Sequence, residues 1–222
     1  MTAHETARDQ INSARNFAAG FTLIELLVVI SIIGLLAALT LGVTGVATRN
    51  MKESRIRSEM NQLITKIEAY NGAHGFYPPD NQFSPGTNQL FYELSGAIFQ
   101  STPTPRFQVI NSAEVLPSGT VTLAFGANGI ANSSRDPKEL RYQGKFKPDE
   151  HKGFTVKSAA KVELLVAPVD RVDGQRLPNP WNYLAKPHAT NNPESFDLWL
   201  DAKIGKKNLR FANWSKTPIP LP

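Results

Sequence analysis

The sequence predicts an α+β protein in which one long N-terminal helix packs on a small antiparallel sheet with a loop-rich C-terminal region. Three observations indicate this class. Residues 26–48 carry no formal charge, apolar side chains then recur every three or four positions, and all 16 prolines lie at or after Pro78. Because proline interrupts helices, the residues before Pro78 can form one helix, whereas those after it must form short elements.

The apolar segment begins in the stretch GFTLIE, Gly20 to Glu25. About 20 apolar residues in a helix cross a bilayer core of about 30 Å, and residues 26–48 meet this length. We therefore expect residues 21–48 to form a membrane-spanning helix. A buried core helix is the alternative, but core helices seldom stay apolar on every face for so long. A carboxylate at Glu25 is costly at this depth unless it is paired or held among headgroups.

The stretch GFTLIE followed by an apolar helix resembles the processing signature of type IV pilins and type II secretion pseudopilins. The resemblance implies that a prepilin peptidase removes residues 1–20 as a leader by cutting after Gly20. It also implies that Phe21 becomes a methylated N-terminus and that Glu25 acts in subunit assembly. In that case the cationic amine of Phe21 can neutralise Glu25 of a neighbouring subunit, because pairing removes the cost of both charges.

An ordinary secretory signal is the rival interpretation, with cleavage after Gly45, Val46 and Ala47. The apolar region of such signals usually spans about 7–15 residues, and this segment is longer and contains an acid near its start. The leader itself departs from the pilin pattern, because its two arginines are balanced by two acids and no basic residue directly precedes Gly20. The positive-inside signal is therefore weak before cleavage.

The helix is expected to continue through residues 49–77 as an amphipathic segment. Apolar side chains recur at spacings of four, three, four and three, which predicts one buried stripe: Ile56, Met60, Leu63, Ile67 and Tyr70. A helix from Phe21 to Tyr70 would measure roughly 75 Å. Gly34, Gly42 and Gly45 weaken it locally, or allow other helices to approach closely.

Residues 78–222 are expected to form a β-rich globular domain with an insertion at residues 83–160. Predicted strands are Phe107–Ile110, Thr120–Phe125, Gly153–Lys157, Val162–Val166 and Phe196–Leu200. Three stretches resemble segments of the major pseudopilins of type II secretion: NGAHGFYPPDN at 71–81, LPNPWNYLAK at 177–186, and SFDLWLDAKIG to ANW at 195–214. Their aromatic residues Trp181, Tyr183, Trp199 and Trp214 are also expected to belong to the core.

We expect no calcium site, although the resemblance suggests the terminal loop for one. Calcium takes six to eight oxygen ligands. Asp197 and Asp201 remain in this loop, but Lys203, Lys206 and Lys207 occupy the stretch where further acids would help. We expect no other metal and no cofactor either. The chain has no cysteine, its four histidines lie far apart in sequence, and no catalytic motif is present, so we do not expect an enzyme.

Five basic residues lie close together near the C-terminus: Lys203, Lys206, Lys207, Arg210 and Lys216. This patch could contact anionic lipid, an acidic secreted protein or nucleic acid, or could simply be solvated. A DNA-uptake pilin is therefore one alternative function, but no groove of aromatic and basic residues is identifiable, and we do not expect nucleic acid as a partner.

Together the residues and the resemblance favour a structural pseudopilin of type II secretion. We expect a single-pass protein of the bacterial inner membrane with its C-terminal domain in the periplasm. Its expected partners are other copies of itself, the prepilin peptidase and methyltransferase, other pseudopilins, the inner-membrane secretion platform and membrane lipid. A surface type IV pilin or minor pilin is the alternative within the same class, and a membrane-anchored enzyme is more distant.

Overall fold

The structure is a computed structural model that describes residues 21–156, 160–174 and 178–222, without the side chains of residues 39–46. The predicted leader with Gly20, and the terminal residues Lys157 and Leu177 of two predicted segments, lie outside the described residues.

Helix α1 (Leu23–His74) contains 52 residues. The chain divides after Val46 into two compact units, so the part of α1 from Ala47 onward belongs to the same unit as the β-rich domain. The helix ends at His74, within the predicted helical segment 49–77. It stops where Gly75 adopts a φ of +80°, a conformation that glycine adopts without strain.

The domain holds three sheets rather than the single small antiparallel sheet that we predicted. The first has the order β3 (Val115–Pro117), β2 (Arg106–Val109), β1 (Ala97–Gln100), β4 (Ser133–Ser134). The second has the order β11 (Ile219–Pro220), β10 (Lys207–Ala212), β9 (Phe196–Ile204), β8 (Asn182–Ala185). The third has the order β5 (His151–Thr155), β6 (Lys161–Ala167), β7 (Asn179–Pro180). All pairs are antiparallel except β1 with β4.

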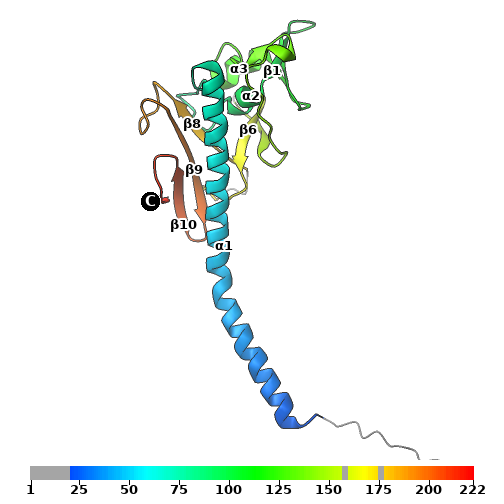
Figure 1. Ribbon diagram of the computed structural model, residues 1–222, viewed down its shortest axis with the longest axis vertical. Helices are drawn as coiled ribbons and strands as arrows, with labels where there is room; N and C mark the ends of the chain where they lie inside the picture. The colour runs from blue at the N-terminus through cyan, green and yellow to red at the C-terminus, as the bar shows by residue number, and fades with distance from the viewer. Residues whose placement is uncertain (1–20, 157–159, 175–177) are drawn as a thin grey trace, which may run out of the picture. The chain divides into compact units, whose positions relative to one another are not determined.

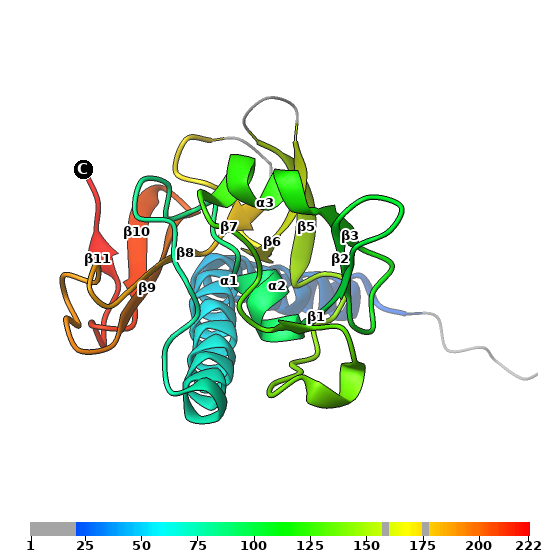
Figure 2. The ribbon, with the colours of Figure 1, turned by 90° about the horizontal axis from the view of Figure 1, so that it is seen from above.

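Within the domain, the sheet β8 to β11 lies on one side of α1 (Figure 1). Strand β6, the sheet that contains β1 and the short helices α2 (Leu90–Ser95) and α3 (Ser118–Phe125) lie on the other side (Figure 2). A single 3-10 turn, η1 (Pro137–Glu139), follows β4 among the described residues.

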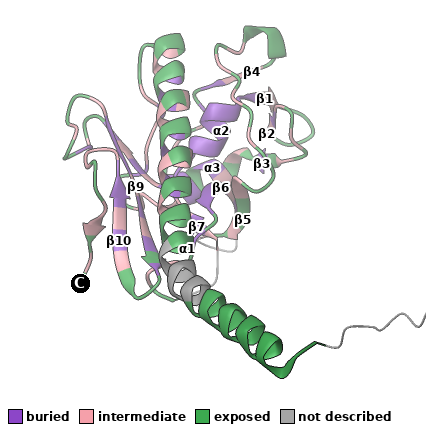
Figure 3. Ribbon diagram, turned by 60° about the horizontal axis from the view of Figure 1, so that its bottom comes forward, coloured by how far each residue is buried: buried purple, intermediate pink, exposed green. Residues whose placement is uncertain are grey.

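The predicted stripe on α1 is confirmed. Its five side chains are at most 6% exposed and belong to one core cluster with residues from all three sheets and from α2 and α3 (Figure 3). Helix α2 is buried along its whole length. Burial against a core, rather than helix propensity, therefore keeps this short segment helical.

Strands β2, β6 and β9 confirm three of the predicted strands, and β5 confirms most of a fourth. The prediction of a strand at Thr120–Phe125 was wrong, because α3 occupies this stretch. Val121, Ala124 and Phe125 are buried at helical spacing, whereas Leu123 is 47% exposed. The apparent alternation arose because apolar residues at positions 121 and 125 fit a helix face as well as a strand face.

A carboxylate that sequence reasoning overlooked, Glu93 of α2, lies fully buried in the core. Its two oxygens accept hydrogen bonds from four groups: Tyr70 Oη (2.9 Å), Gln89 Nε2 (3.0 Å), Ala131 N (2.7 Å) and Asn132 N (2.9 Å). The network joins α2 to the last buried position of the α1 stripe and to the loop before β4. Burial raises the pKa of Glu93 to about 7, although the hydrogen bonds from Ala131, Asn132 and Tyr70 oppose that rise.

From the raised pKa of Glu93 we predict that the domain is more stable in mild acid than at neutral pH. Because its folded pKa lies above the ordinary value of 4.5, the folded state holds the proton more tightly than the unfolded state. The free energy of unfolding should therefore fall by about 3 kcal/mol as the pH rises from about 4.5 to about 7. Urea unfolding in detergent solution at a series of pH values, followed by tryptophan fluorescence, measures this change.

The variant Glu93→Gln removes the titrating group, so it should flatten the pH dependence, even though it lowers stability at every pH. Glu139→Gln is the control, because Glu139 is exposed and should keep the pH dependence of the original chain. An unchanged pH dependence in Glu93→Gln would show that other groups produce it.

Candidate functional site

The predicted processing and assembly segment lies at the start of α1. Phe21 is 79% exposed and precedes the helix, which begins at Leu23. The backbone N–H and the hydroxyl of Thr22 both donate to Glu25 Oε2, at 2.8 and 2.7 Å. In return the backbone N–H of Glu25 donates to Thr22 Oγ1 at 3.3 Å.

These reciprocal hydrogen bonds form a capping box, in which a threonine before the helix and a glutamate three residues later satisfy each other's backbone N–H groups. The first turns of helices also favour negative charge. Thr22 was not among the predicted site residues. The pattern Thr-x-x-Glu before an apolar run is a sequence signal that identifies it.

Glu25 therefore has a role within its own chain besides the predicted pairing between subunits. Both bonds from Thr22 go to Oε2, and within the described part of the chain no hydrogen bond to Oε1 is present. That oxygen is therefore the atom with room for a donor from outside the chain.

Residues 23–38 of the helix are exposed on every face. Its apolar side chains between Leu23 and Leu36 are 43–83% exposed, with Val29 the least and Leu23 the most exposed. Exposed apolar area of this kind marks a surface that another apolar phase covers. Among the residues that the structure describes, no helix meets the combined length and apolarity needed for a membrane crossing.

Comparison with known proteins identifies the segment independently. Residues 15–41 match the model of the prokaryotic N-terminal methylation motif. The chain is also 30% identical over 128 residues to the type IV major fimbrial protein FimA of Dichelobacter nodosus, an alignment that covers 53% of this chain and 77% of the relative. The chain belongs to the type IV pilin family. No solved structure matches it.

Membership of the type IV pilin family implies assembly into filaments and processing by a prepilin peptidase, and the motif implies a membrane-anchored precursor. The α+β architecture, with a long N-terminal helix and antiparallel sheets, is consistent with a pilin. Which residues are cut, methylated or paired stays a prediction.

Both acids of the stretch where a calcium site was considered lie in strand β9, and amides of the preceding loop hold the first of them, Asp197. Asp197 is 1% exposed and accepts hydrogen bonds from the backbone N–H groups of Thr190, Asn191 and Asn192, each at 2.9 Å. The side-chain amides of Asn191 and Asn192 donate to the same carboxylate at 3.0 and 3.2 Å. Calcium needs oxygen ligands, but these groups present N–H donors to the carboxylate instead.

The second acid of this stretch, Asp201, binds Arg210 across the pair β9 and β10. Arg210 Nε and Nη2 donate to the two oxygens of Asp201, each at 2.7 Å. Among the described residues, no cluster of three or more His, Cys, Asp or Glu side chains could hold a metal ion. The absence of a calcium site stays a prediction. The ion pair with Asp201 also means that Arg210 does not add a free positive charge to the predicted basic patch.

The predicted core aromatics separate into two pairs. Trp181 and Tyr183 are buried, at 2% and 0% exposed, and this part of the prediction is confirmed. Trp199 and Trp214 are only partly buried, so their assignment to the core was wrong. They pack edge to face with ring centroids 5.9 Å apart, on the outer side of β9, because alternation along β9 points Trp199 away from its buried neighbours Leu198 and Leu200.

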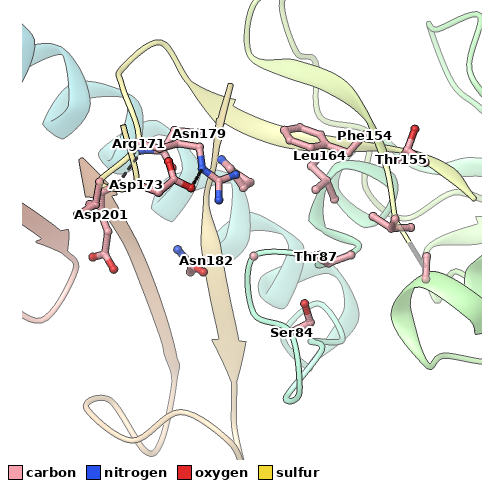
Figure 4. A pocket seen from close by; sticks show the side chains of 15 residues that line it. Ser84, Thr87, Phe154, Thr155, Leu164, Arg171, Asp173, Asn179, Asn182 and Asp201 are labelled. Atoms are coloured by element: carbon pink, nitrogen blue, oxygen red, sulfur yellow. Dashed lines mark hydrogen bonds and ion pairs between the residues drawn. The ribbon is translucent and has the colours of Figure 1, made fainter. Parts of the chain in front are cut away.

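A hollow of about 570 Å³ lies between β7, the start of β8 and the loop around Ser84 (Figure 4). Its two carboxylates are each paired with an arginine: Asp173 with Arg171 at 3.0 Å, and Asp201 with Arg210. Acid–base catalysis needs a carboxyl group that is available to exchange a proton with a substrate. Paired in this way, the two acids of this hollow are poorly suited to that chemistry.

From the buried hydrogen bonds of Asp197 we predict that the Asp197 carboxylate stabilises the domain and that calcium chelation does not change this stability. Asp197→Asn should lower the free energy of unfolding by about 3 kcal/mol, because an amide group replaces one acceptor oxygen and leaves buried N–H donors unpaired. Urea unfolding of the full chain in detergent measures the loss. Asp149→Asn is the matched control, because Asp149 is 64% exposed.

The same unfolding curve should be unchanged by EDTA or by added calcium, since a ligand that binds only the folded state must raise its stability. A shift of the midpoint with chelator would establish a metal site and contradict this assignment.

Proposed function

We propose that this chain is the subunit of a type II secretion pseudopilus. In this proposal the leader 1–20 is removed, Phe21 becomes the methylated N-terminus, and residues 21–48 hold the subunit in the inner membrane until it enters the filament. Residues 78–222 then face the periplasm. The subunit is structural and not an enzyme, and its partners are other copies, other pseudopilins, the prepilin peptidase and the secretion platform.

The observation that carries the choice of a pseudopilin is that the three stretches with pseudopilin resemblance contact one another in the domain. The Tyr183 hydroxyl donates to the backbone oxygen of Pro78 at 2.9 Å. The backbone N–H of Ala185 donates to Asp80 at 2.9 Å. The stretch 71–81 is therefore bound to the stretch 177–186 by buried or partly buried hydrogen bonds.

The third stretch, residues 195–214, contacts the first. The Ser195 hydroxyl donates to Tyr77 Oη at 3.1 Å, and the ring of Tyr77 packs on Phe196 with centroids 5.3 Å apart. Resemblances that are separate in sequence thus belong to one packed unit, as expected when a whole domain, rather than isolated residues, is related to the major pseudopilins.

A surface type IV pilus is the second candidate, and the similarity to a fimbrial protein favours it. Deletion of the gene separates the two functions. A pseudopilin mutant should retain exported proteins in the periplasm, and wild-type cells should show no surface filaments containing this chain by immunoelectron microscopy. Abundant labelled surface filaments together with normal secretion would select the pilin instead.

In the proposed mechanism, Glu25 sets the register between subunits. The amine created at Phe21 and the carboxylate of Glu25 lie four residues apart, so a neighbour displaced along the filament axis can bring its amine to Glu25 Oε1. The capping bonds hold Oε2 on Thr22 and orient the carboxylate. Pairing neutralises two charges in an apolar environment, which neither subunit can do alone.

Two substitutions of Glu25 distinguish charge pairing from capping. Glu25→Ala removes both functions. Glu25→Gln keeps an acceptor for the capping box but removes the charge, and glutamine is a normal residue at this position of the motif. If pairing with the Phe21 amine drives assembly, both variants should reduce disulfide cross-linking between cysteines placed on adjacent helices to near background, and both should abolish secretion.

Thr22→Val is the complementary control, because it removes the hydroxyl of the cap and keeps the acid. It should retain most of the cross-linking. Mass spectrometry should find a methylated Phe21 terminus in every variant, because the cut lies before the substituted positions. Full assembly of Glu25→Gln would refute the charge-pairing role, and a terminus at Thr48 would establish the secretory-signal interpretation.

A further inference from the structure

A second hollow in the domain, about 590 Å³ in volume, combines residues that are far apart in sequence. Arg49 and Glu53 of α1 form one wall. The β9–β10 turn with Lys206 and Lys207 forms another, and the C-terminal segment around Pro220 completes the lining. The backbone N–H of Leu221 donates to Asn208 O at 3.0 Å, so this last wall is tied to β10.

The hollow carries a positive excess that sequence alone did not locate. Its lining includes three positive side chains, Arg49, Lys206 and Lys207. It also includes one negative side chain, Glu53, which forms an ion pair with Arg49 at 2.8 Å. Even if a terminal carboxylate at Pro222 is counted, one positive charge remains in excess. Lys206 and Lys207 are exposed and, within the described part of the chain, take part in no ion pair.

The structure divides the basic patch that was predicted from sequence. Arg210 is bound to Asp201 on the other face of the β9–β10 hairpin, because alternation along β10 points residues 207 and 210 to opposite faces. The two lysines at the turn are therefore the part of the patch that lies beside α1 and remains available to a ligand.

The position of Arg49 in the chain indicates what this hollow meets. Arg49 is the first charged residue after the uncharged residues 26–48. In a helix each residue advances about 1.5 Å, so Arg49 lies within one turn of the end of that segment. If residues 21–48 cross the membrane, Arg49 stands at the depth of the lipid headgroups, and so does a hollow that Arg49 lines.

We propose that the hollow formed by Arg49, Lys206 and Lys207 binds the headgroups of anionic phospholipids and so seats the domain on the membrane surface before assembly. The inference rests on the proposed membrane anchor. Basic residues next to a membrane segment attract anionic lipid, and each contributes roughly a fivefold preference near the surface. Entry of a subunit into the filament then requires release of these lysines from the membrane.

The full chain offers a direct test because it contains no native cysteine. Leu221→Cys places one fluorescent label in the hollow, at a side chain that is only partly buried. The labelled protein is reconstituted at low density in vesicles of phosphatidylcholine, with or without phosphatidylglycerol. Quenching by a water-soluble quencher and by quencher-labelled lipid headgroups reports which surroundings the label has.

Anionic vesicles should lower aqueous quenching and raise headgroup quenching several-fold relative to neutral vesicles. The double variant Lys206→Gln, Lys207→Gln should lose this difference. The control Lys138→Gln, Lys145→Gln makes the same change of net charge at exposed lysines outside the hollow and should keep it.

Equal quenching in both kinds of vesicle, or equal loss in both double variants, would overturn the headgroup site. Protection that grows with protein density would assign the hollow to contacts between copies and would also overturn it. Failure of the chain to float with neutral vesicles after a high-salt wash is a different result, because it would refute the membrane anchor itself.

Discussion

Burial of one apolar face of α1 is the interaction on which the domain depends. Five side chains on that face are almost inaccessible, and each contributes roughly 1.5–3 kcal/mol through removal from water. Each of the three sheets contributes residues to the same core cluster, so the short strands do not have separate cores of their own. The last of the five, Tyr70, also donates to the buried carboxylate of Glu93 and thereby extends the same interaction from apolar packing to a polar network.

The sequence was informative wherever a repeating pattern determined the structure. The spacing of Ile56, Met60, Leu63, Ile67 and Tyr70 can only produce one helical face, and that face is buried. Strand β9 was equally readable because its alternation continues over several residues. Shorter elements were harder to predict. The apolar residues of α3 fit a helix and a strand equally well, and only their contacts in the folded domain decide between the two.

Sequence patterns could not predict the polar contacts between residues that are distant in the chain. Glu93 has the appearance of an exposed helix residue, yet its partners Ala131 and Asn132 follow nearly forty positions later. The ion pair of Arg210 with Asp201 depends on the register of β9 with β10, and without that register the basic patch seemed uniform. The capping of α1 by Thr22 and Glu25 is the opposite case, because its signal is local and was present in the sequence.

The hydrogen bonds to Asp197 also bear on the order in which the domain folds. They join residues at most seven positions apart, whereas the Tyr183 hydroxyl reaches Pro78 across 105 positions. Closing a long loop costs more chain entropy than closing a short one, and long-range contacts form more slowly. We therefore expect the turn at residues 190–197 to close early. Pairing of the segments 71–81, 177–186 and 195–214 then completes folding, because it joins residues that are separated by most of the domain.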